Sequence, residues 1–233
     1  NLGEKVLNMA DVADAKIDAW LLLEMVCKID RSFYYLHMED EVAEEQLSEY
    51  EIALRKRAEH VPLQYIVGEA EFMGLKFKVN SNVLIPRQDT ETLVEEALKV
   101  VKPGMKVLDM CTGSGCIIVS IVHNIPEVEG VATDISKQAL LVAKENAKLN
   151  QVSVTFERSD LFDNVTGTYD VIVSNPPYIR TGEVVKLMPE VQEFEPMEAL
   201  DGKEDGLYFY RKIIKECKSY LKPGGHILFE IGY

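Results

Sequence analysis

The stretch Lys106–Gly115, KVLDMCTGSG, decides the fold of this 233-residue chain. Its first half, KVLD, is an apolar run of the length of a short strand, and its second half is a turn that contains Gly113 and Gly115. Residues 117–124 then have the composition of a helix. A buried strand that passes through a glycine turn into a helix is typical of the first unit of a parallel α/β sheet.

Short apolar runs alternate with helical segments downstream of this unit. Strands are predicted at 130–134, 152–156, 169–174 and 226–231, and helices at 137–149 and 207–221. Strands that are separated by helices pair in parallel through right-handed crossovers. The pattern therefore predicts an α/β fold with a doubly wound, mostly parallel, Rossmann-like sheet. The sequence KPGG at 222–225 is expected to be the turn between the last helix and the last strand.

Two other textures precede the sheet. Residues 1–60 carry apolar side chains three and four positions apart, which is typical of amphipathic helices. Residues 64–85 carry an apolar pattern around Gly74 that is typical of a β-hairpin. We therefore predict a small N-terminal helical domain over 1–63, a β-hairpin linker over 64–86 and the α/β domain over 87–233.

Capping residues precede two of the predicted helices. Asp14 or Asp18 is expected to cap the first long helix, and Thr90 or Asp89 the helix that opens the α/β domain. Over residues 1–65 there are 14 acidic and 7 basic side chains. Solvation is the common reason for such an acidic face, and a docking surface for a basic partner is the alternative.

Composition excludes several classes of protein. The chain is 47% apolar, with 25 Lys and Arg against 39 Asp and Glu, so its net charge is −14. This apolar fraction is too high for a disordered chain, and the negative charge argues against stable nucleic-acid binding. The four cysteines and four histidines are scattered, so we expect no metal site and reduced thiols in a cytoplasmic protein. The apolar runs are far shorter than the ~20 residues of a membrane span, so no membrane partner is expected.

The glycine turn and the next strand together indicate a nucleoside cofactor. Gly113 and Gly115 give the backbone freedom to expose its amides to a ligand at the start of a helix. Asp134 is the first acid of the following strand, where a carboxylate can accept hydrogen bonds from both hydroxyls of a ribose. A plain tight turn with a capping aspartate is the less favoured interpretation.

Four further positions favour S-adenosylmethionine over a nicotinamide cofactor. A dinucleotide fingerprint needs a third glycine, and Ile118 stands in that place. Asp109 precedes the turn and could reach the ammonium group of an amino-acid-bearing nucleoside. Asp160 and Leu161 follow the third strand, where they could meet an adenine. S-adenosylmethionine combines this ammonium group with a ribose and an adenine.

The sequence Asn175-Pro176-Pro177-Tyr178, NPPY, follows the fourth strand. The prolines stiffen the loop, so the carbonyl of Pro176 and the side-chain carbonyl of Asn175 could accept the two N–H bonds of a planar substrate. Tyr178 could stack on the plane of that substrate. These bonds would return electron density to a nitrogen whose lone pair is delocalised. A carboxamide and an adenine both carry such an NH₂ group, so the motif alone leaves both open.

At this point the chain closely resembles the HemK/PrmC family, the methyltransferases that modify the glutamine of the GGQ motif in class-1 peptide chain release factors. The resemblance covers essentially the whole chain. The motifs that carry it are FMGLKFKVNSNVLIPRQDTETLVEEAL, VLDMCTGSGC, TDIS, SDLF, VSNPPYI and PGGHILFEIGY. NPPY alone is shared with amino-methylating DNA and RNA enzymes, and IPRQDTE together with NPPY is more specific.

The resemblance implies a site and its partners. The donor S-adenosylmethionine, with S-adenosylhomocysteine as its product, would be held by Cys111, Thr112, Gly113, Ser114, Gly115 and Asp134, with Leu161 beside the adenine. The glutamine would be held by Asn175, Pro176, Pro177 and Tyr178, with Arg87 and Glu91 of the linker motif nearby. Cys111 stands where the family usually has glycine, and we expect it to alter packing rather than abolish binding.

The resemblance also implies a seven-stranded donor-binding domain, whose final antiparallel strand pair would follow Tyr233, and an N-terminal domain that helps to grip the release factor. We expect a monomer. The alternative activity, methylation of the N6 nitrogen of adenine in DNA or RNA, would need a basic groove or a target-reading domain. No Lys- and Arg-rich block supplies one in this sequence.

Overall fold

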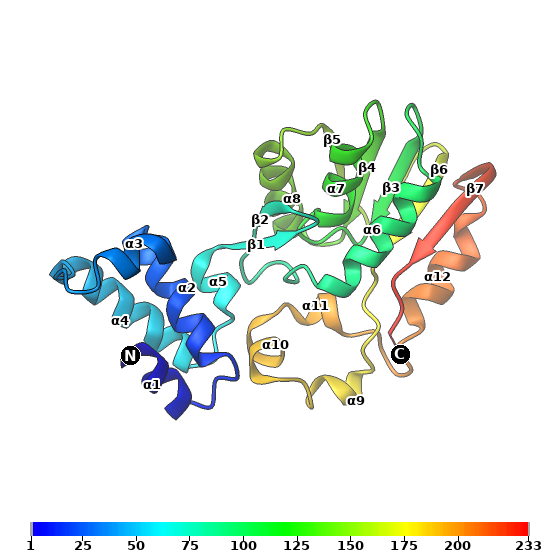
Figure 1. The fold of residues 1–233 in the computed structure, drawn as a ribbon. Coiled ribbons are helices and arrows are strands. Elements are labelled where there is room, and N and C mark those ends of the chain that lie inside the picture. The colour runs from blue at the N-terminus through cyan, green and yellow to red at the C-terminus, as the bar shows by residue number, and fades with distance from the viewer. Residues whose placement is uncertain (1, 233) are drawn as a thin grey trace. The chain divides into compact units, whose positions relative to one another are not determined.

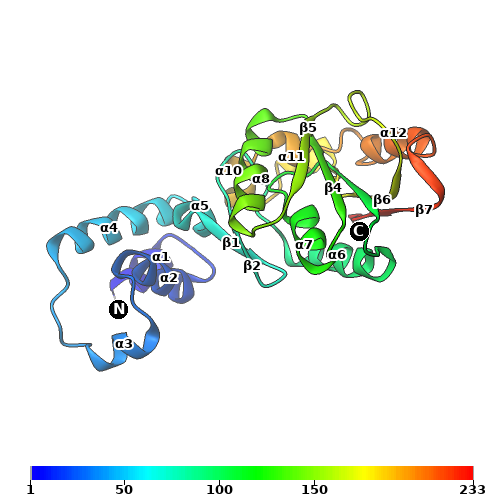
Figure 2. The same cartoon turned by 90° about the horizontal axis from the view of Figure 1, so that it is seen from above.

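The computed structural model describes residues 2–232 and divides the chain into two compact units (Figures 1 and 2). The first unit contains the residues up to Gly68 together with Pro189–Phe194. The second contains Glu69–Met188 and the residues from Glu195 onward. The sequence analysis places Pro189–Phe194 in the α/β domain, whereas the structure groups these residues with the first unit. A segment of six residues within a long loop carries no sequence pattern that would assign it to another unit.

The first unit is helical, as its apolar spacing predicts. Its helices are α1 (Leu2–Met9), α2 (Ala15–Cys27), α3 (Arg31–Leu36), α4 (Glu44–Ala58), α5 (Leu63–Val67) and α10 (Pro189–Phe194). Leu7, Leu22 and Leu54 form the centre of its apolar core, one each from α1, α2 and α4. Asp30 caps α3, because its side chain accepts a hydrogen bond from the Phe33 amide at 2.7 Å.

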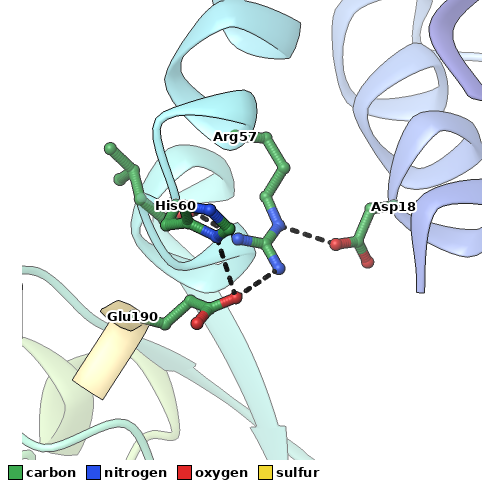
Figure 3. A network of polar contacts seen from close by, with 5 residues as sticks. Asp18, Arg57, His60 and Glu190 are labelled. Carbon is green, nitrogen blue, oxygen red and sulfur yellow. Dashed lines mark hydrogen bonds and ion pairs between the residues drawn. The ribbon is translucent and has the colours of Figure 1, made fainter. Parts of the chain in front are cut away.

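A buried arginine connects three helical segments of this unit (Figure 3). Arg57 Nε donates to Asp18 at 2.7 Å, and Arg57 Nη2 donates to Glu190 of α10 at 3.0 Å. His60 Nδ1 lies 3.7 Å from the same Glu190 oxygen. The expectation that Asp14 or Asp18 caps α2 is met only in the position of Asp14. Asp14 occupies the cap position without a side-chain bond, and Asp18 is the buried partner of Arg57.

The second unit contains a five-stranded sheet in the order β5-β4-β3-β6-β7, and every neighbouring pair is parallel. This confirms the predicted doubly wound α/β sheet. The strands of this sheet are β3 (Lys106–Met110), β4 (Glu129–Asp134), β5 (Val154–Arg158), β6 (Tyr169–Ser174) and β7 (Leu221–Phe229). The helices of the unit are α6 (Gln88–Val100), α7 (Cys116–Asn124), α8 (Lys137–Leu149), α9 (Thr181–Val184), α11 (Met197–Leu200) and α12 (Tyr208–Cys217).

The central strands bury both of their faces. Val107 and Val173 pack on one face with residues of α6 and α7. Leu108 and Ile172, one position away along the same strands, pack on the other face with Ile213 of α12. Successive side chains of a strand point to opposite faces, so the near-continuous apolar runs of β3 and β6 follow from helices on both sides (Figure 2).

The predicted hairpin is present but shorter than the 64–86 segment assigned to it. It consists of β1 (Glu69–Phe72) and β2 (Leu75–Lys78), which pair antiparallel, and α5 takes up residues before it. Its two-residue turn is Met73-Gly74, and both residues have positive φ, 52° and 71°. A turn with two positive φ angles matches the twist of a tight hairpin, which is why Gly74 stands there.

Two sequence-based details are wrong. The first residue of α6 is Gln88 and its cap position is Arg87, so Asp89 and Thr90 lie in the first turn and do not cap the helix. The sequence KPGG does not precede the last strand but lies inside it. Tyr169 pairs with Leu221, and Val171 pairs with His226, so residues 222–225 form a bulge within β7.

No helix within residues 2–232 is long and apolar enough to cross a membrane. The main sheet of the described residues has five of the seven strands that the resemblance implies.

Candidate functional site

The candidate site lies where the chain reverses direction across the sheet. From β3 the chain passes to β4 and β5 on one side, and it later returns to β6 and β7 on the other side of β3. The loops after β3 and β6 therefore diverge at the switch point, where open α/β sheets bind their ligands. A cavity of about 380 Å³ opens there, and its lining includes Thr112, Gly113, Asp134, Leu161 and Asn175.

The loop after β3 presents open backbone to this cavity. Gly113 has φ +54°, and a Cβ added to it would meet no heavy atom within 4 Å, so its outer side is free to receive a ligand. Gly115 has φ +80°, and an added Cβ would lie 3.0 Å from the Cβ of Ala143. The two glycines thus serve different purposes. Gly113 leaves room for a ligand, and Gly115 lets α7 begin close against α8.

Cys111 opens the same loop in a conformation that favours glycine. Its φ is +62°, and its side chain lines the cavity. A non-glycine residue in the left-handed region is held at a free-energy cost of roughly 1–2 kcal/mol. Burial raises the pKa of the Cys111 thiol, so the group remains protonated and acts as a small apolar wall of the cavity rather than as a nucleophile.

Asp134 holds the glycine loop and keeps acceptor capacity for a ligand. Its Oδ2 accepts a hydrogen bond from the Gly113 amide at 2.9 Å, and its Oδ1 accepts one from the Ser136 amide at 2.9 Å. A carboxylate has about four acceptor positions. Two positions therefore remain for donors in the cavity, the number that two ribose hydroxyls would fill. Burial raises the pKa of Asp134, and the two amide bonds oppose that shift.

Asp109 lies behind the loop and is fully buried. Its Oδ2 accepts a hydrogen bond from the Thr112 hydroxyl at 2.6 Å, and its Oδ1 has no partner among residues 2–232. Burial raises the pKa of this carboxyl to about 7. Asp109 does not line the cavity, although Thr112 does. The structure thus reaches the cavity through Thr112, and direct contact between Asp109 and an ammonium group stays a prediction.

The far end of the cavity is built from the segment after β5 and from α12. Asp160 and Leu161 line it as the sequence predicts, and Leu161 has a positive φ of 49°. Tyr208, Phe209 and Lys212 of α12 line the same hollow, and sequence reasoning missed all three. Two aromatic rings and a leucine give this end the flat apolar walls that suit a nucleobase.

Asn175 and Pro177 of the NPPY sequence line the cavity. The Asn175 amide nitrogen donates to the hydroxyl of Thr90 at 3.4 Å, and among the described residues its carbonyl oxygen accepts no hydrogen bond. Pro176 is buried and does not line the cavity. Asn175 therefore offers a free acceptor on the same hollow that the glycine loop borders.

The structure does not place Tyr178 in this cavity. Its hydroxyl donates to the Glu230 carboxylate at 3.2 Å, and its ring lies so close to Gly232 that an added Cβ there would be 2.8 Å from a ring carbon. Burial and the neighbouring Glu230 raise the pKa of Tyr178 to about 12. The expected stacking of Tyr178 on a substrate has no counterpart in the cavity lining, because Glu230 and Gly232 hold the ring elsewhere.

Arg87 and Glu91 behave differently from each other. Arg87 lines the cavity and forms an ion pair with Glu195, whose side chain is 1% exposed. Glu91 does not line the cavity. Its carboxylate accepts a hydrogen bond from the Met73 amide at 2.6 Å, so it holds the hairpin turn against α6. The geometry supports a place for Arg87 beside a ligand and a structural role for Glu91.

Asn146 is a supporting residue that the sequence analysis missed. It is fully buried in α8, and its amide nitrogen donates to the carbonyls of Ser114 and Lys78 at 2.9 and 3.0 Å. Its carbonyl accepts a hydrogen bond from the Lys78 amide at 2.6 Å. Asn146 thus links the glycine loop after β3 to the hairpin. A lone asparagine on the apolar face of a helix is the sequence signal that marks it.

The site as a whole fits a nucleoside that carries an amino acid. The glycine loop leaves open space beside Gly113, Asp134 offers free acceptor positions, and α12 offers aromatic walls. The expected exposed amides are not those of Thr112, Gly113 and Gly115, because these donate to Thr133, Asp134 and Thr112. Among residues 2–232 no group of three or more His, Cys, Asp or Glu side chains is arranged to hold a metal ion.

Comparisons with known proteins agree with this assignment. The PrmC N-terminal domain model matches residues 1–68, and the methyltransferase small domain model matches residues 87–192. The release factor glutamine methyltransferase of Geobacter sulfurreducens is 41% identical over 222 residues, which cover 95% of this chain and 78% of that protein. That of Clostridium acetobutylicum is 45% identical over 222 residues, which cover 92% of this chain and 78% of that protein.

Proposed function

We infer the function from the premise that the chain belongs to the release factor glutamine methyltransferase family. We propose that it transfers a methyl group from S-adenosylmethionine to the side-chain nitrogen, N5, of the glutamine in the GGQ motif of class-1 release factors. The observation that carries the proposal is that the glycine loop and the free carbonyl of Asn175 border one cavity.

The residues of the cavity divide the donor between them. We propose that Asp134 accepts the ribose hydroxyls through its remaining acceptor positions and that the amino-acid part lies in the open space beside Gly113. Asp160 and Leu161 would border the adenine. When bound, S-adenosylmethionine supplies a methyl group on a positively charged sulfur, and S-adenosylhomocysteine is the product.

Asn175, which lines the cavity, and Pro176, which does not, are the two proposed acceptors for the glutamine. We propose that the Asn175 side-chain carbonyl and the Pro176 backbone carbonyl accept the two N–H bonds of the carboxamide. These bonds return electron density to a nitrogen that resonance makes a poor nucleophile, and they hold it in place for attack. Such positioning can contribute up to roughly 7–11 kcal/mol. No strong base is required, because the nitrogen becomes acidic once it carries the methyl group and its proton can then leave.

The partner is proposed to be the release factor itself, bound by a monomeric cytoplasmic enzyme. The acidic face of the first unit is the proposed docking surface, and it is motivated by the excess of acidic side chains over residues 1–65. Docking through charge should weaken as salt is added, because surface charges are screened beyond a distance of about 10 Å at 0.1 M salt.

The direct test offers the enzyme labelled donor with either a release factor or adenine-containing DNA. We expect label in the release factor and none in the DNA. Asn175→Ala should reduce the transfer rate by about 10²-fold or more, as the loss of one well-placed polar contact can, and should leave donor affinity in calorimetry nearly unchanged. Label in DNA and none in the release factor would reject the proposal.

A further inference from the structure

Thr90 is the side chain in contact with the polar end of Asn175. Its hydroxyl oxygen accepts the hydrogen bond from the Asn175 amide nitrogen, at 3.4 Å. Thr90 is 3% exposed, and both residues line the cavity. The two residues are 85 positions apart in the sequence, since Thr90 lies in the first turn of α6 and Asn175 follows β6.

The backbone holds Thr90 in place from both sides. Its amide donates to the Arg87 carbonyl at 3.1 Å, and Arg87 is fixed in turn by its ion pair with the buried Glu195. The other side of α6 is tied to the hairpin through Glu91 and Met73. The Thr90 hydroxyl is therefore a rigid acceptor, whereas the Asn175 side chain would otherwise rotate about its own bonds.

A threonine at the start of a helix often caps it, but Thr90 does not cap α6. The cap position of α6 is Arg87, and no side-chain bond caps the helix there. Among residues 2–232, this buried hydroxyl, which does not cap the helix, has only Asn175 as a side-chain partner. A valine would fill the same volume, so packing alone does not explain the hydroxyl.

We propose that Thr90 is a positioning residue for methyl transfer, and that its hydroxyl sets the direction of the Asn175 carboxamide. With its nitrogen bound to Thr90, Asn175 turns its carbonyl oxygen toward the cavity, where the N–H of the glutamine must be accepted. The substrate and Thr90 then bind opposite ends of one amide group. This inference rests on the proposed function, because it assigns Thr90 to the reaction in which Asn175 takes part.

The kinetic test compares one substitution that removes the hydroxyl at nearly constant volume with one that keeps the hydroxyl. Thr90→Val removes the hydroxyl, and we expect kcat to fall about tenfold because a neutral hydrogen bond contributes on that order, with donor affinity unchanged. Thr90→Ser keeps the hydroxyl and should recover most of the rate. Thr92→Val, on the exposed side of the same helix, is the matched control for helix propensity. An equal loss in the Val and Ser variants would show a packing role and overturn the inference.

A double-mutant cycle separates positioning from an independent effect. In the Asn175→Ala background, Thr90→Val should change kcat by less than twofold, because the group that Thr90 positions is gone. If the two losses multiply instead, Thr90 acts by another route and the proposal is wrong.

A spectroscopic readout tests the contact without any turnover. In protein labelled with ¹⁵N-asparagine, the side-chain NH₂ signal of Asn175 is identified by its loss in Asn175→Ala. We expect this signal to shift in Thr90→Val and to stay near its original position in Thr90→Ser. An unchanged signal in Thr90→Val would overturn the inference. A wild-type enzyme that fails to methylate release factors while this signal does shift would instead contradict the proposed function alone.

Discussion

Two buried aspartates, one in each unit, are treated in opposite ways. Asp18 in the first unit has a side chain that is 7% exposed and is paired with Arg57, which also binds Glu190 (Figure 3). Asp109 in the second unit is fully buried with one hydroxyl for a partner and one oxygen with none in the described chain. The paired carboxylate of Asp18 holds helices together. The carboxyl of Asp109, which has no charged partner, lies behind the candidate site.

This difference separates stability from function in the molecule. Removing one partner of a buried ion pair leaves an uncompensated charge, which is among the largest losses that a single substitution causes. An unpaired buried carboxyl already carries its penalty in the native state, and so its replacement can stabilise the fold. The predictions below use this contrast, beginning with the largest expected effect.

Arg57→Met should destabilise the first unit by about 3–5 kcal/mol, because it leaves Asp18 buried and unpaired. Trp20 is the only tryptophan of the chain and lies in α2, so its fluorescence during urea denaturation of the whole protein reports on this unit. Arg55→Met changes an exposed arginine of the same helix and should cost less than about 0.5 kcal/mol. Equal midpoints for the two variants would show that the buried pair contributes nothing.

Asp109→Asn should remove a pH dependence from the stability of the second unit. The folded pKa of about 7 lies above the usual value near 4, so the native state binds more protons between these pH values. Wild-type stability should therefore fall as pH rises from about 4 to 7, by about 3–4 kcal/mol. The asparagine does not titrate and should escape that loss. Parallel stability curves for the two proteins, from circular dichroism in urea, would contradict the assignment.

The two units also differ in backbone strain, which substitutions at two cysteines can test. Cys111 has φ +62°, whereas Cys27 ends helix α2. At Cys111 glycine should give a more stable protein than alanine by about 1 kcal/mol, because alanine is strained in the left-handed region. At Cys27 the order should reverse, since glycine is the poorer helix residue by up to about 1 kcal/mol. The same order at both positions, in thermal unfolding, would show that the loop carries no strain.

The sheet and the part of the site formed by the glycine turn and Asp134 could be predicted from the sequence, because they depend on local patterns. The glycine turn after β3 and the acid at the end of β4 follow from strand and helix periodicity alone. Asn175 and Pro177 reach the same cavity because the carboxyl ends of parallel strands meet at one edge. Each of these residues is positioned by its own element.

The features that sequence reasoning missed depend on contacts between distant segments. Threonine is a common capping residue, so the sequence predicts a helix cap at Thr90. Only the structure shows that the Thr90 hydroxyl contacts Asn175, 85 residues away. Tyr178 directly follows Pro177, which borders the cavity, yet its ring is held by Glu230 near the end of the chain. Pro189–Phe194 joins the first unit through an ion pair with Arg57 that no local pattern reveals. Local sequence patterns carry no information about contacts between segments that lie so far apart in the chain.

The account depends most on the claim that Asn175 presents an acceptor to a glutamine beside the donor cavity. The direct measurement is mass spectrometry of a class-1 release factor before and after incubation with S-adenosylmethionine and the enzyme. The account predicts that the peptide containing GGQ gains the mass of one methyl group on its glutamine, with wild-type enzyme and not with Asn175→Ala. A methyl group on another residue, or an equal gain with Asn175→Ala, would contradict it.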